Sequence, residues 1–157
     1  MAIVCLDTSI VIWGILGQGK AEDERKREQA VYLLGMLQQQ KDRVLLPAIV
    51  LAEVVAKMSP QNRREVVSRL SSACEIAPFD TASALKFGEV RAVGMQKRSR
   101  EFPRKEISLD SLIVAICMRH DVQVLYTDDG KLGKIAAHFM RVEGLPRIPP
   151  TPLSLLA

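Results

Sequence analysis

Four acidic residues interrupt apolar runs of the sequence: Asp7 in IVCLDTSI, Glu53 in VLAEVVA, Asp110 in SLDSLIVA and Asp129 in LYTDDGKL. A carboxylate is rarely buried without a partner, so four acids beside core-like segments need a common explanation. Carboxylates about 4 Å apart repel by roughly 4 kcal/mol per pair at an effective dielectric near 20, unless a cation or a raised pKa relieves the repulsion. The pattern predicts an acidic cluster that binds a divalent metal ion.

The residue types at these positions favour Mg²⁺ or Mn²⁺ as that ion. Carboxylates offer only oxygen ligands, whereas zinc sites ordinarily draw on His or Cys. The two histidines, His120 and His138, lie outside any recognisable acid–base motif, which disfavours chemistry based on paired histidines.

Each acid, taken alone, also has a simple structural explanation. Asp7 can cap a helix, and Asp129 can belong to a turn before Gly130. Glu53 can extend from a helix into solvent, and Asp110 can be stabilised by the dipole in the first turn of a helix. These alternatives stay open for each residue, and the recurrence of four acids is what favours the metal site.

The elements that must position the acids alternate between strands and helices. We expect strands at residues 2–6, 44–46, 75–79 and 123–126, and helices at 21–40, 47–58, 60–73, 81–95 and 109–120, the last one capped by Ser108. This alternation predicts an α/β domain with a central, mostly parallel sheet flanked by α-helices. Ligands of such sheets bind beyond the carboxyl ends of the strands, where Asp7 and Asp129 fall.

Apolar spacing predicts which sides of two helices face the core. Val31, Leu34 and Leu37 form one stripe in the helix at 21–40, which ends at three glutamines. Leu85 and Val90, with Val93, give the helix at 81–95 its apolar spacing.

Length and composition fit one globular domain over residues 1–157. A hydrophobic content of 48% argues against disorder, and the longest uncharged run, residues 8–19, is too short to cross a membrane. Three cysteines, Cys5, Cys74 and Cys117, are far apart in largely apolar sequence, which favours reduced core thiols over disulfides. We therefore expect a cytoplasmic protein with no membrane association.

A basic segment at residues 96–106 offers contacts for a polyanion. It contains five cations against two acids, and Pro103 disfavours a continuous helix, so we expect an exposed loop or arm. The segment can follow phosphate oxygens of RNA or can be an ordinary solvated loop. Its cations are Lys97, Arg98, Arg100, Arg104 and Lys105.

Aromatic residues are few, which disfavours a module that reads RNA sequence by stacking on bases. Trp13 lies in an apolar stretch after the first acid, and we expect it to pack in the core or at an oligomer contact.

With these motifs in place, the chain resembles the PIN-domain nucleases, of the VapC-like kind that serve as toxins in type II toxin–antitoxin pairs of bacteria and archaea. The resemblance rests on LDTSIVI, LAEVV, DSLIVAICMRH, TDD and the proline-containing GLPRIPPTPLSLL, and it covers nearly the whole chain. Each motif is short and degenerate, but their order is fairly specific. The strand ending in TDD places the last acid of the family pattern on Asp129 rather than Asp128.

The resemblance implies a parallel sheet flanked by helices and a ribonuclease activity that depends on Mg²⁺ or Mn²⁺. Its metal would be held by Asp7, Glu53, Asp110 and Asp129. Neighbouring side chains that would assist are Thr8, Ser9, Thr127 and Asp128. The basic segment is longer than the corresponding connection in compact members, which leaves the substrate preference open.

The resemblance also implies partners: the family commonly forms homodimers and is inhibited by a small antitoxin that occupies the active-site groove. The helix at 21–40 could help to accept such a partner, although packing on the core explains its amphipathic pattern as well.

Rival functions remain at this point. The acids could be vestigial in a catalytically inactive PIN-like module that binds protein or RNA, or they could serve a nuclease of RNA processing outside toxin–antitoxin pairs. A haloacid-dehalogenase-type phosphatase is disfavoured because Ser9 stands where that motif needs a second Asp, and a receiver domain because no acid precedes the first strand. A nucleotide-binding P-loop is disfavoured because Ala21 stands where the metal-binding Ser or Thr belongs.

Overall fold

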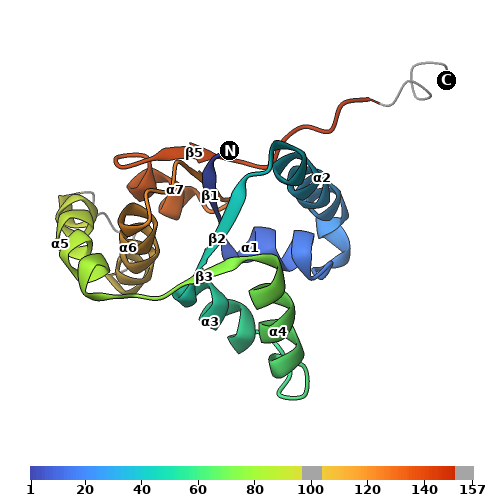
Figure 1. The fold of residues 1–157 in the computed structure, drawn as a ribbon, viewed down its shortest axis with the longest axis horizontal. Coiled ribbons are helices and arrows are strands. Elements are labelled where there is room, and N and C mark those ends of the chain that lie inside the picture. Colours follow the sequence, from blue (N-terminus) through green and yellow to red (C-terminus); the bar gives the residue numbers. More distant parts are fainter. Residues whose placement is uncertain (97–103, 151–157) are drawn as a thin grey trace.

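A central sheet organises the computed structural model, which describes residues 1–96 and 104–150. Across these ranges, five strands, all parallel, lie in the order β3-β2-β1-β4-β5 (Figure 1). The strands are β1 (Ile3–Leu6), β2 (Arg43–Pro47), β3 (Glu75–Ala77), β4 (Val124–Tyr126) and β5 (Arg141–Glu143). The α/β prediction with a parallel sheet is confirmed.

Strand β1 lies at the centre because its residues are apolar on both faces. The run IVCL is continuous rather than alternating, as expected for a strand covered by helices on both sides, and Cys5 and Leu6 are completely buried. Its neighbours are in register with Val4 opposite both Val44 of β2 and Val124 of β4.

The strand order creates a switch point between β1 and β4. The chain builds outward from β1 through β2 to β3, and then returns to the other side of β1 for β4 and β5. At such a point the loops after the two neighbouring strands diverge, which leaves a crevice at the carboxyl end of the sheet. Asp7 follows β1, and Thr127 follows β4.

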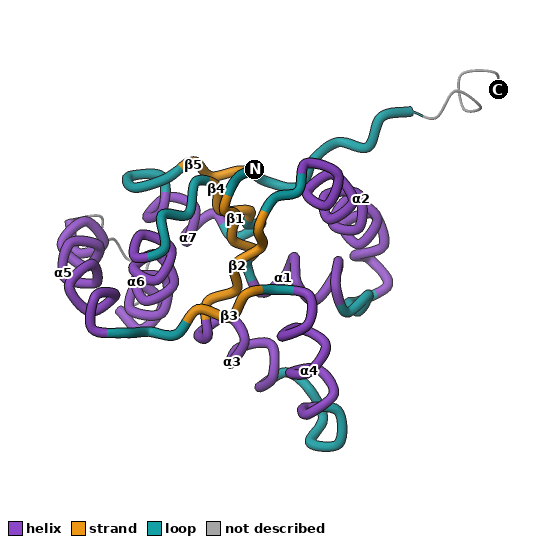
Figure 2. Tube along the Cα trace, in the orientation of Figure 1, coloured by secondary structure: helices purple, strands orange, loops and turns teal. Residues whose placement is uncertain are grey.

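Helices cover both faces of the sheet. They are α1 (Thr8–Ile10), α2 (Glu24–Gln40), α3 (Ala48–Ala56), α4 (Arg63–Ala73), α5 (Thr81–Gln96), α6 (Arg104–Arg119) and α7 (Gly130–Ala136). Helices α2 and α4 lie on one side and α6 and α7 on the other, with α5 outside α6 (Figures 1 and 2). Right-handed crossovers produce this division, because connections that run in opposite directions along the sheet place their helices on opposite faces.

The connection between β1 and α2 contains two irregular turns. A π-helical turn, η1 (Val11–Ile15), follows α1, and a 3₁₀ turn, η2 (Ala21–Asp23), precedes α2. Gly14 allows η1 to approach α2 closely, because a Cβ atom there would lie 3.0 Å from Leu34 Cδ1 and 3.2 Å from the Cβ of Ala30.

This close approach also explains why the predicted core stripe of α2 was wrong at Val31, which is 56% exposed. The buried residues are Ala30, Leu33 and Leu37. Compared with the predicted stripe, the buried side is rotated by about one residue, and the small Ala30 lies where η1 crosses the helix. The helix predicted at 81–95 is present as α5, although Leu85 is 76% exposed on it, and α5 packs mainly on α6.

The beginning of α6 differs from the prediction. The helix starts at Arg104, so Ser108 lies inside it and is not its cap, because the intervening Arg, Lys and Glu residues favour helix over turn. Arg104 and Lys105 therefore belong to a helix and not to the predicted exposed loop. The remaining cations of the basic segment, Lys97, Arg98 and Arg100, lie outside the described residues.

The C-terminal part of the chain contains a strand that the sequence did not predict. Strand β5 is only three residues long, and its charged ends hide the strand pattern. After it, the Nε2 of Gln29 on α2 donates a hydrogen bond to the carbonyl of Pro146 at 2.9 Å. The chain therefore packs beside α2 at Pro146, whereas residues 147–150 are exposed and lead away from the body (Figure 1).

Two smaller expectations can be compared with the structure. Cys5, Cys74 and Cys117 are free and buried, as predicted. In the two described ranges, no helix combines the length and the apolar character needed to span a membrane.

Candidate metal centre

Asp7 is the most buried of the four predicted acids, with 6% of its surface exposed. Its backbone N–H continues the sheet by donating to the carbonyl of Tyr126 at 3.0 Å. Its Oδ1 accepts from the backbone N–H of Thr8 at 2.7 Å and so caps α1, while its Oδ2 accepts from the hydroxyl of Thr127 at 2.8 Å. Capping therefore occupies one carboxylate oxygen, and the other joins β1 to the loop after β4.

Thr8 connects this carboxylate to Glu53. The Thr8 hydroxyl donates to Oε2 of Glu53 at 2.6 Å. Glu53 belongs to α3, which begins directly after Pro47 at the carboxyl end of β2, and its side chain is partly buried. The alternative in which Glu53 extends into solvent is therefore wrong.

Thr127 connects Asp7 to Asp129. The hydroxyl that donates to Asp7 also accepts from the backbone N–H of Asp129 at 2.9 Å. The side chain of Asp129 is exposed and caps α7 by accepting from the backbone N–H groups of Lys131 and Leu132, at 2.9 and 3.5 Å. The sequence suggested a turn before Gly130, whereas Asp129 in the structure caps α7, a helix that the sequence did not predict.

Asp110 lies on α6, which covers the opposite face of the sheet from α2. It is the seventh residue of α6 and not part of its first turn, so the predicted stabilisation by the helix dipole is wrong. Its side chain is partly buried next to the fully buried Ser111, and α6 packs against both α3 and α7.

Two further predicted residues flank the acids. Ser9 is partly buried in α1. Asp128 is exposed, and its Oδ2 accepts from the ammonium of Lys26 at 2.8 Å.

The surroundings of Asp7 oppose its ionisation. Burial raises the pKa of the Asp7 carboxyl above its ordinary value, while the hydrogen bonds from Thr127 and Thr8 lower it. The negative charges of Asp129 and Glu53 raise the pKa further, because a nearby like charge disfavours the ionised form. A cation bound beside Asp7 would remove this penalty.

The donor set suits a hard divalent cation, because carboxylate and hydroxyl oxygens are the ligands that Mg²⁺ and Mn²⁺ prefer. Thr8 joins Asp7 to Glu53, and Thr127 joins Asp7 to Asp129. Within residues 1–96 and 104–150, no three His, Cys, Asp or Glu side chains lie close enough to form a metal cage. The residues fit a divalent ion by their chemistry and provide an open arrangement of ligands.

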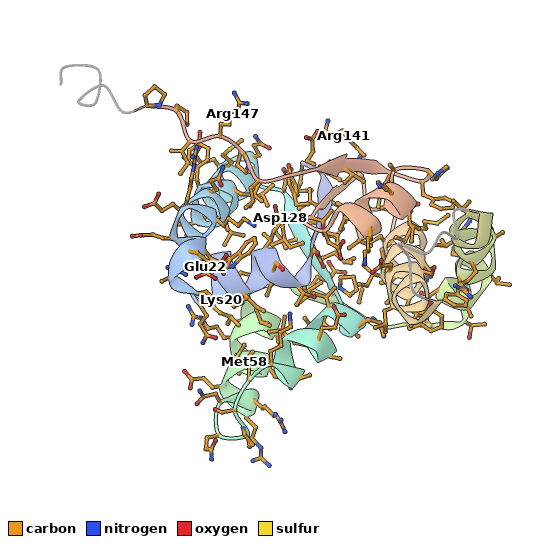
Figure 3. The ribbon with its side chains drawn as sticks, turned by 180° about the vertical axis from the view of Figure 1, so that it is seen from behind. Lys20, Glu22, Met58, Asp128, Arg141 and Arg147 are labelled. Atoms are coloured by element: carbon orange, nitrogen blue, oxygen red, sulfur yellow. The ribbon has the colours of Figure 1, made fainter. Side chains whose placement is uncertain are left out.

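A contact between Lys26 and Trp13 lies beside the acids, and no sequence pattern predicted it. The ammonium of Lys26 lies 5.0 Å from the centre of the Trp13 ring, while it is paired with Asp128. Figure 3 shows Asp128 between the α7 side of the sheet and the turns that carry Lys20 and Glu22. Nothing in the highly charged run from residue 20 to 28 distinguishes Lys26, and the contact spans 102 residues, so only the fold reveals it.

A cavity of about 630 Å³ lies away from the acids. It is bounded by the π turn η1, the C-terminal half of α2, strand β2 and helix α4, with Asp42 and Arg69 among its lining residues. None of the four predicted acids lines this cavity.

Comparison with known proteins matches most of this chain to one family. The family model described as "PIN domain" matches residues 4–138, which include all four acids. Among curated proteins, none matches the chain by sequence.

Solved structures share the fold at low sequence identity. A VapBC2 complex from Rickettsia felis, bound to a DNA fragment from its promoter, contains a chain with 21% identity and a TM-score of 0.66, covering 92% of this chain and 99% of that one. A chain of a DNA-bound VapBC complex from Salmonella typhimurium has 22% identity and a TM-score of 0.62, and the match covers 93% of this chain and 100% of that one. A chain of VapBC-5 of Mycobacterium tuberculosis, a member of the VapBC family of toxin–antitoxin systems, has 20% identity and a TM-score of 0.50. The match covers 92% of this chain and 98% of that one.

Proposed function

The chain belongs to the PIN-domain family, and from that premise we propose that it is a metal-dependent endoribonuclease that hydrolyses phosphodiester bonds of RNA. PIN domains are in general nucleases that use divalent metal ions. One observation carries the proposal to these residues: Asp7 is a buried carboxylate at the switch point of the sheet, with Glu53 and Asp129 close enough to raise its pKa.

The proposed ligands come from four different elements. Asp7 and Asp110 are the preferred direct ligands, and Glu53 and Asp129 would bind the ion directly, bind it through water, or orient the attacking water. When bound, Mg²⁺ or Mn²⁺ supplies an activated water and neutralises charge on the phosphate and on the leaving oxygen.

The threonines hold these carboxylates in position. Thr127 fixes Oδ2 of Asp7 and the backbone of Asp129 with a single hydroxyl, and Thr8 fixes Oε2 of Glu53. Hydrogen bonds of this kind orient a ligand and favour its ionised form, which is the form that binds a cation. Ser9 and Asp128 are proposed to assist at the edge of the site.

RNA requires positive surface beside this negative centre, since its phosphates are repelled by the acids. We assign that role to the basic segment, of which Arg104 and Lys105 lie at the start of α6, the helix that carries Asp110. Lys97, Arg98 and Arg100 complete the proposed surface.

We further propose that the nuclease is the VapC-like toxin of a toxin–antitoxin pair in the cytoplasm, with a cognate antitoxin and a homodimeric state. The similarity in fold to chains of VapBC complexes supports this proposal. Measurement of the size of the protein with and without the product of a neighbouring reading frame tests it. A monomer that binds no such product would contradict the toxin assignment and favour an RNA-processing nuclease.

A catalytically inactive PIN-like interaction module is the second candidate. It is favoured by the absence of a closed metal cage in the described ranges and by the capping role that Asp7 and Asp129 already fulfil. In that case the acids serve the fold alone.

Cleavage of a mixed RNA panel by the purified protein decides between the candidates. The assay compares Mg²⁺, Mn²⁺ and EDTA, with the double variant Asp7→Asn/Asp110→Asn as the control for contaminating nuclease. Cutting that requires metal and is lost in the variant supports the nuclease. No cutting, together with no divalent-metal binding by calorimetry in antitoxin-free protein, would favour the interaction module.

A further inference from the structure

Lys26 places a positive charge at the rim of the acidic site. It lies in the first turn of α2, on the far side of the sheet from α7, yet its ammonium reaches Oδ2 of Asp128 at 2.8 Å. Asp128 stands between Thr127, which binds Asp7, and Asp129. The cation is therefore fixed one residue away from the acids that we assign to the metal.

The surroundings of Lys26 hold its ammonium in place. It lies 5.0 Å from the centre of the Trp13 ring, which is 8% exposed and therefore supports the cation as a packed side chain. The loop at 17–20 closes over the indole: a Cβ atom on Gly19 would lie 3.0 Å from Trp13 Cδ1, and the guanidinium of Arg27 donates to the carbonyl of Lys20 at 2.6 Å. A rigid aromatic surface thus supports a lysine side chain that is itself 43% exposed.

The Lys26 ammonium can exchange Asp128 for another anionic partner at low energetic cost. Both side chains are partly exposed, at 43% and 37%, and an ion pair in such a setting contributes at most about 1 kcal/mol because water screens the charges. A phosphate oxygen of a nucleic acid strand offers the ammonium an equivalent partner. A strand that reaches Asp7 must also pass the acids, whose repulsion a neighbouring cation would offset.

We propose that Lys26 binds a backbone phosphate of the RNA next to the cleaved bond, and that Asp128 holds the ammonium over Trp13 until the strand replaces it. The inference rests on the proposed nuclease function and adds a binding residue from α2 to it. A simple structural ion pair between α2 and the β4–α7 loop is the competing explanation.

The two halves of the ion pair distinguish these explanations. If the pair is structural, Lys26→Met and Asp128→Asn should have similar effects. If Lys26 binds phosphate, Lys26→Met should weaken RNA binding several-fold, whereas Asp128→Asn should tighten it, because the ammonium is released and a repelling charge is lost. Lys26→Arg, which keeps the charge, should restore binding.

The experiment measures binding of a fluorescein-labelled, mixed-sequence single-stranded RNA in EDTA, with every variant made in the Asp7→Asn background to prevent cleavage. The slope of log affinity against log salt should fall by about 0.7 for Lys26→Met, the value for one phosphate contact on a single strand. Lys41→Met is the matched control because this substitution removes the same charge at the other end of α2. Lys41 is the C-cap residue of that helix, about 22 Å from Lys26 along the helix axis.

Trp13 provides an independent readout because it is the only tryptophan in the sequence. Unlabelled RNA of the same sequence should change Trp13 emission in the Asp7→Asn protein as the ammonium leaves the indole, and Lys26→Met should abolish that change. Unchanged affinity and salt slope in Lys26→Met would overturn the inference. Failure of the nuclease proposal is recognised separately, as an absence of metal-dependent cleavage by the protein with Asp7 intact.

Discussion

The two ends of the sheet differ in the partners of their charged side chains. At the amino end, charged groups are paired: Arg43 at the start of β2 binds Glu75 at the start of β3, and Asp42 accepts from the backbone N–H of Ala2 at 2.6 Å. At the carboxyl end, the buried Asp7 faces like charges that raise its pKa. The charged groups at the amino end are paired, whereas the carboxyl end keeps a costly arrangement that the proposed cation would make favourable.

The largest effect should come from Asp7→Asn. Asn has a similar shape and can still accept from the Thr8 N–H, but its amide nitrogen can only donate to the Thr127 hydroxyl, and the charge is lost. Metal-dependent cleavage should therefore fall by about 100-fold or more, the scale for losing one group that stabilises charge in a transition state. The measurement is the rate of RNA cleavage in Mg²⁺ or Mn²⁺. Asp42→Asn makes the same chemical change at the amino end and should leave the rate unaltered. Equal losses in the two variants would remove the distinction between the ends.

Asp7→Asn should also stabilise the protein, and this effect should depend on pH. Because the folded pKa of Asp7 is raised, the folded state holds this proton more tightly than the unfolded state does, and ionisation costs stability as the pH rises through the folded value. In EDTA, the variant should therefore melt above the wild type at neutral pH. The difference should disappear below the ordinary carboxyl pKa, near pH 4. A lower melting temperature for the variant at neutral pH would contradict the assigned cost of burial.

Thr127→Val should have a smaller effect on cleavage, about 10- to 100-fold, as expected for a residue that orients a metal ligand. Valine keeps the shape but cannot donate to Asp7 or accept from the backbone of Asp129. Thr127→Ser keeps the hydroxyl and should retain most activity. Added Mn²⁺ should recover part of the valine variant's rate if the loss lies in ligand orientation, and an unaltered rate in Thr127→Val would exclude the positioning role.

Asp42→Ala should act on stability alone. It leaves the partly buried N–H of Ala2 without its acceptor, which should cost about 1–2 kcal/mol in the free energy of unfolding. Denaturant unfolding measures this loss, and Asp42→Asn, which can still accept, is the control. The rate of cleavage by the folded protein should be unchanged, and a reduced rate would show that the two ends are coupled.

The smallest effect should come from the exposed pair of Arg43 and Glu75. A double-mutant cycle with Arg43→Gln and Glu75→Gln should give a coupling energy below about 1 kcal/mol, because both side chains are about half exposed. Thermal or denaturant unfolding of the four proteins provides the cycle. A coupling of several kcal/mol would mean that the amino end, too, stores strong electrostatic energy.

Local sequence patterns predicted the sheet and the place of Asp7 because both depend on short apolar runs. Strand β1 is apolar throughout, and the polar residue that ends it falls at the carboxyl edge. The same reasoning failed at Ser108, where a good capping residue lies inside a helix, and at Val31, where the crossing of η1 decided which side of α2 is buried.

The contacts that define the candidate site were beyond local reasoning. Thr127 binds Asp7 across 120 residues, and Lys26 reaches Asp128 across 102. Sequence offered Thr127 as an assisting residue through the family resemblance, but the sharing of its hydroxyl between Asp7 and the backbone of Asp129 follows from the pairing of β1 with β4. No sequence pattern distinguished Lys26 from the other charged residues around it.

The position of β4 beside β1 has a consequence for the order in which the molecule is made. During synthesis, β1, β2 and β3 leave the ribosome long before β4, so residues 1–77 can emerge with Asp7 and Thr8 but without Thr127. Pairings between distant segments close last, because the loop entropy must be overcome before the contact forms. The nascent chain therefore carries an incomplete candidate centre until β4 has emerged and paired with β1.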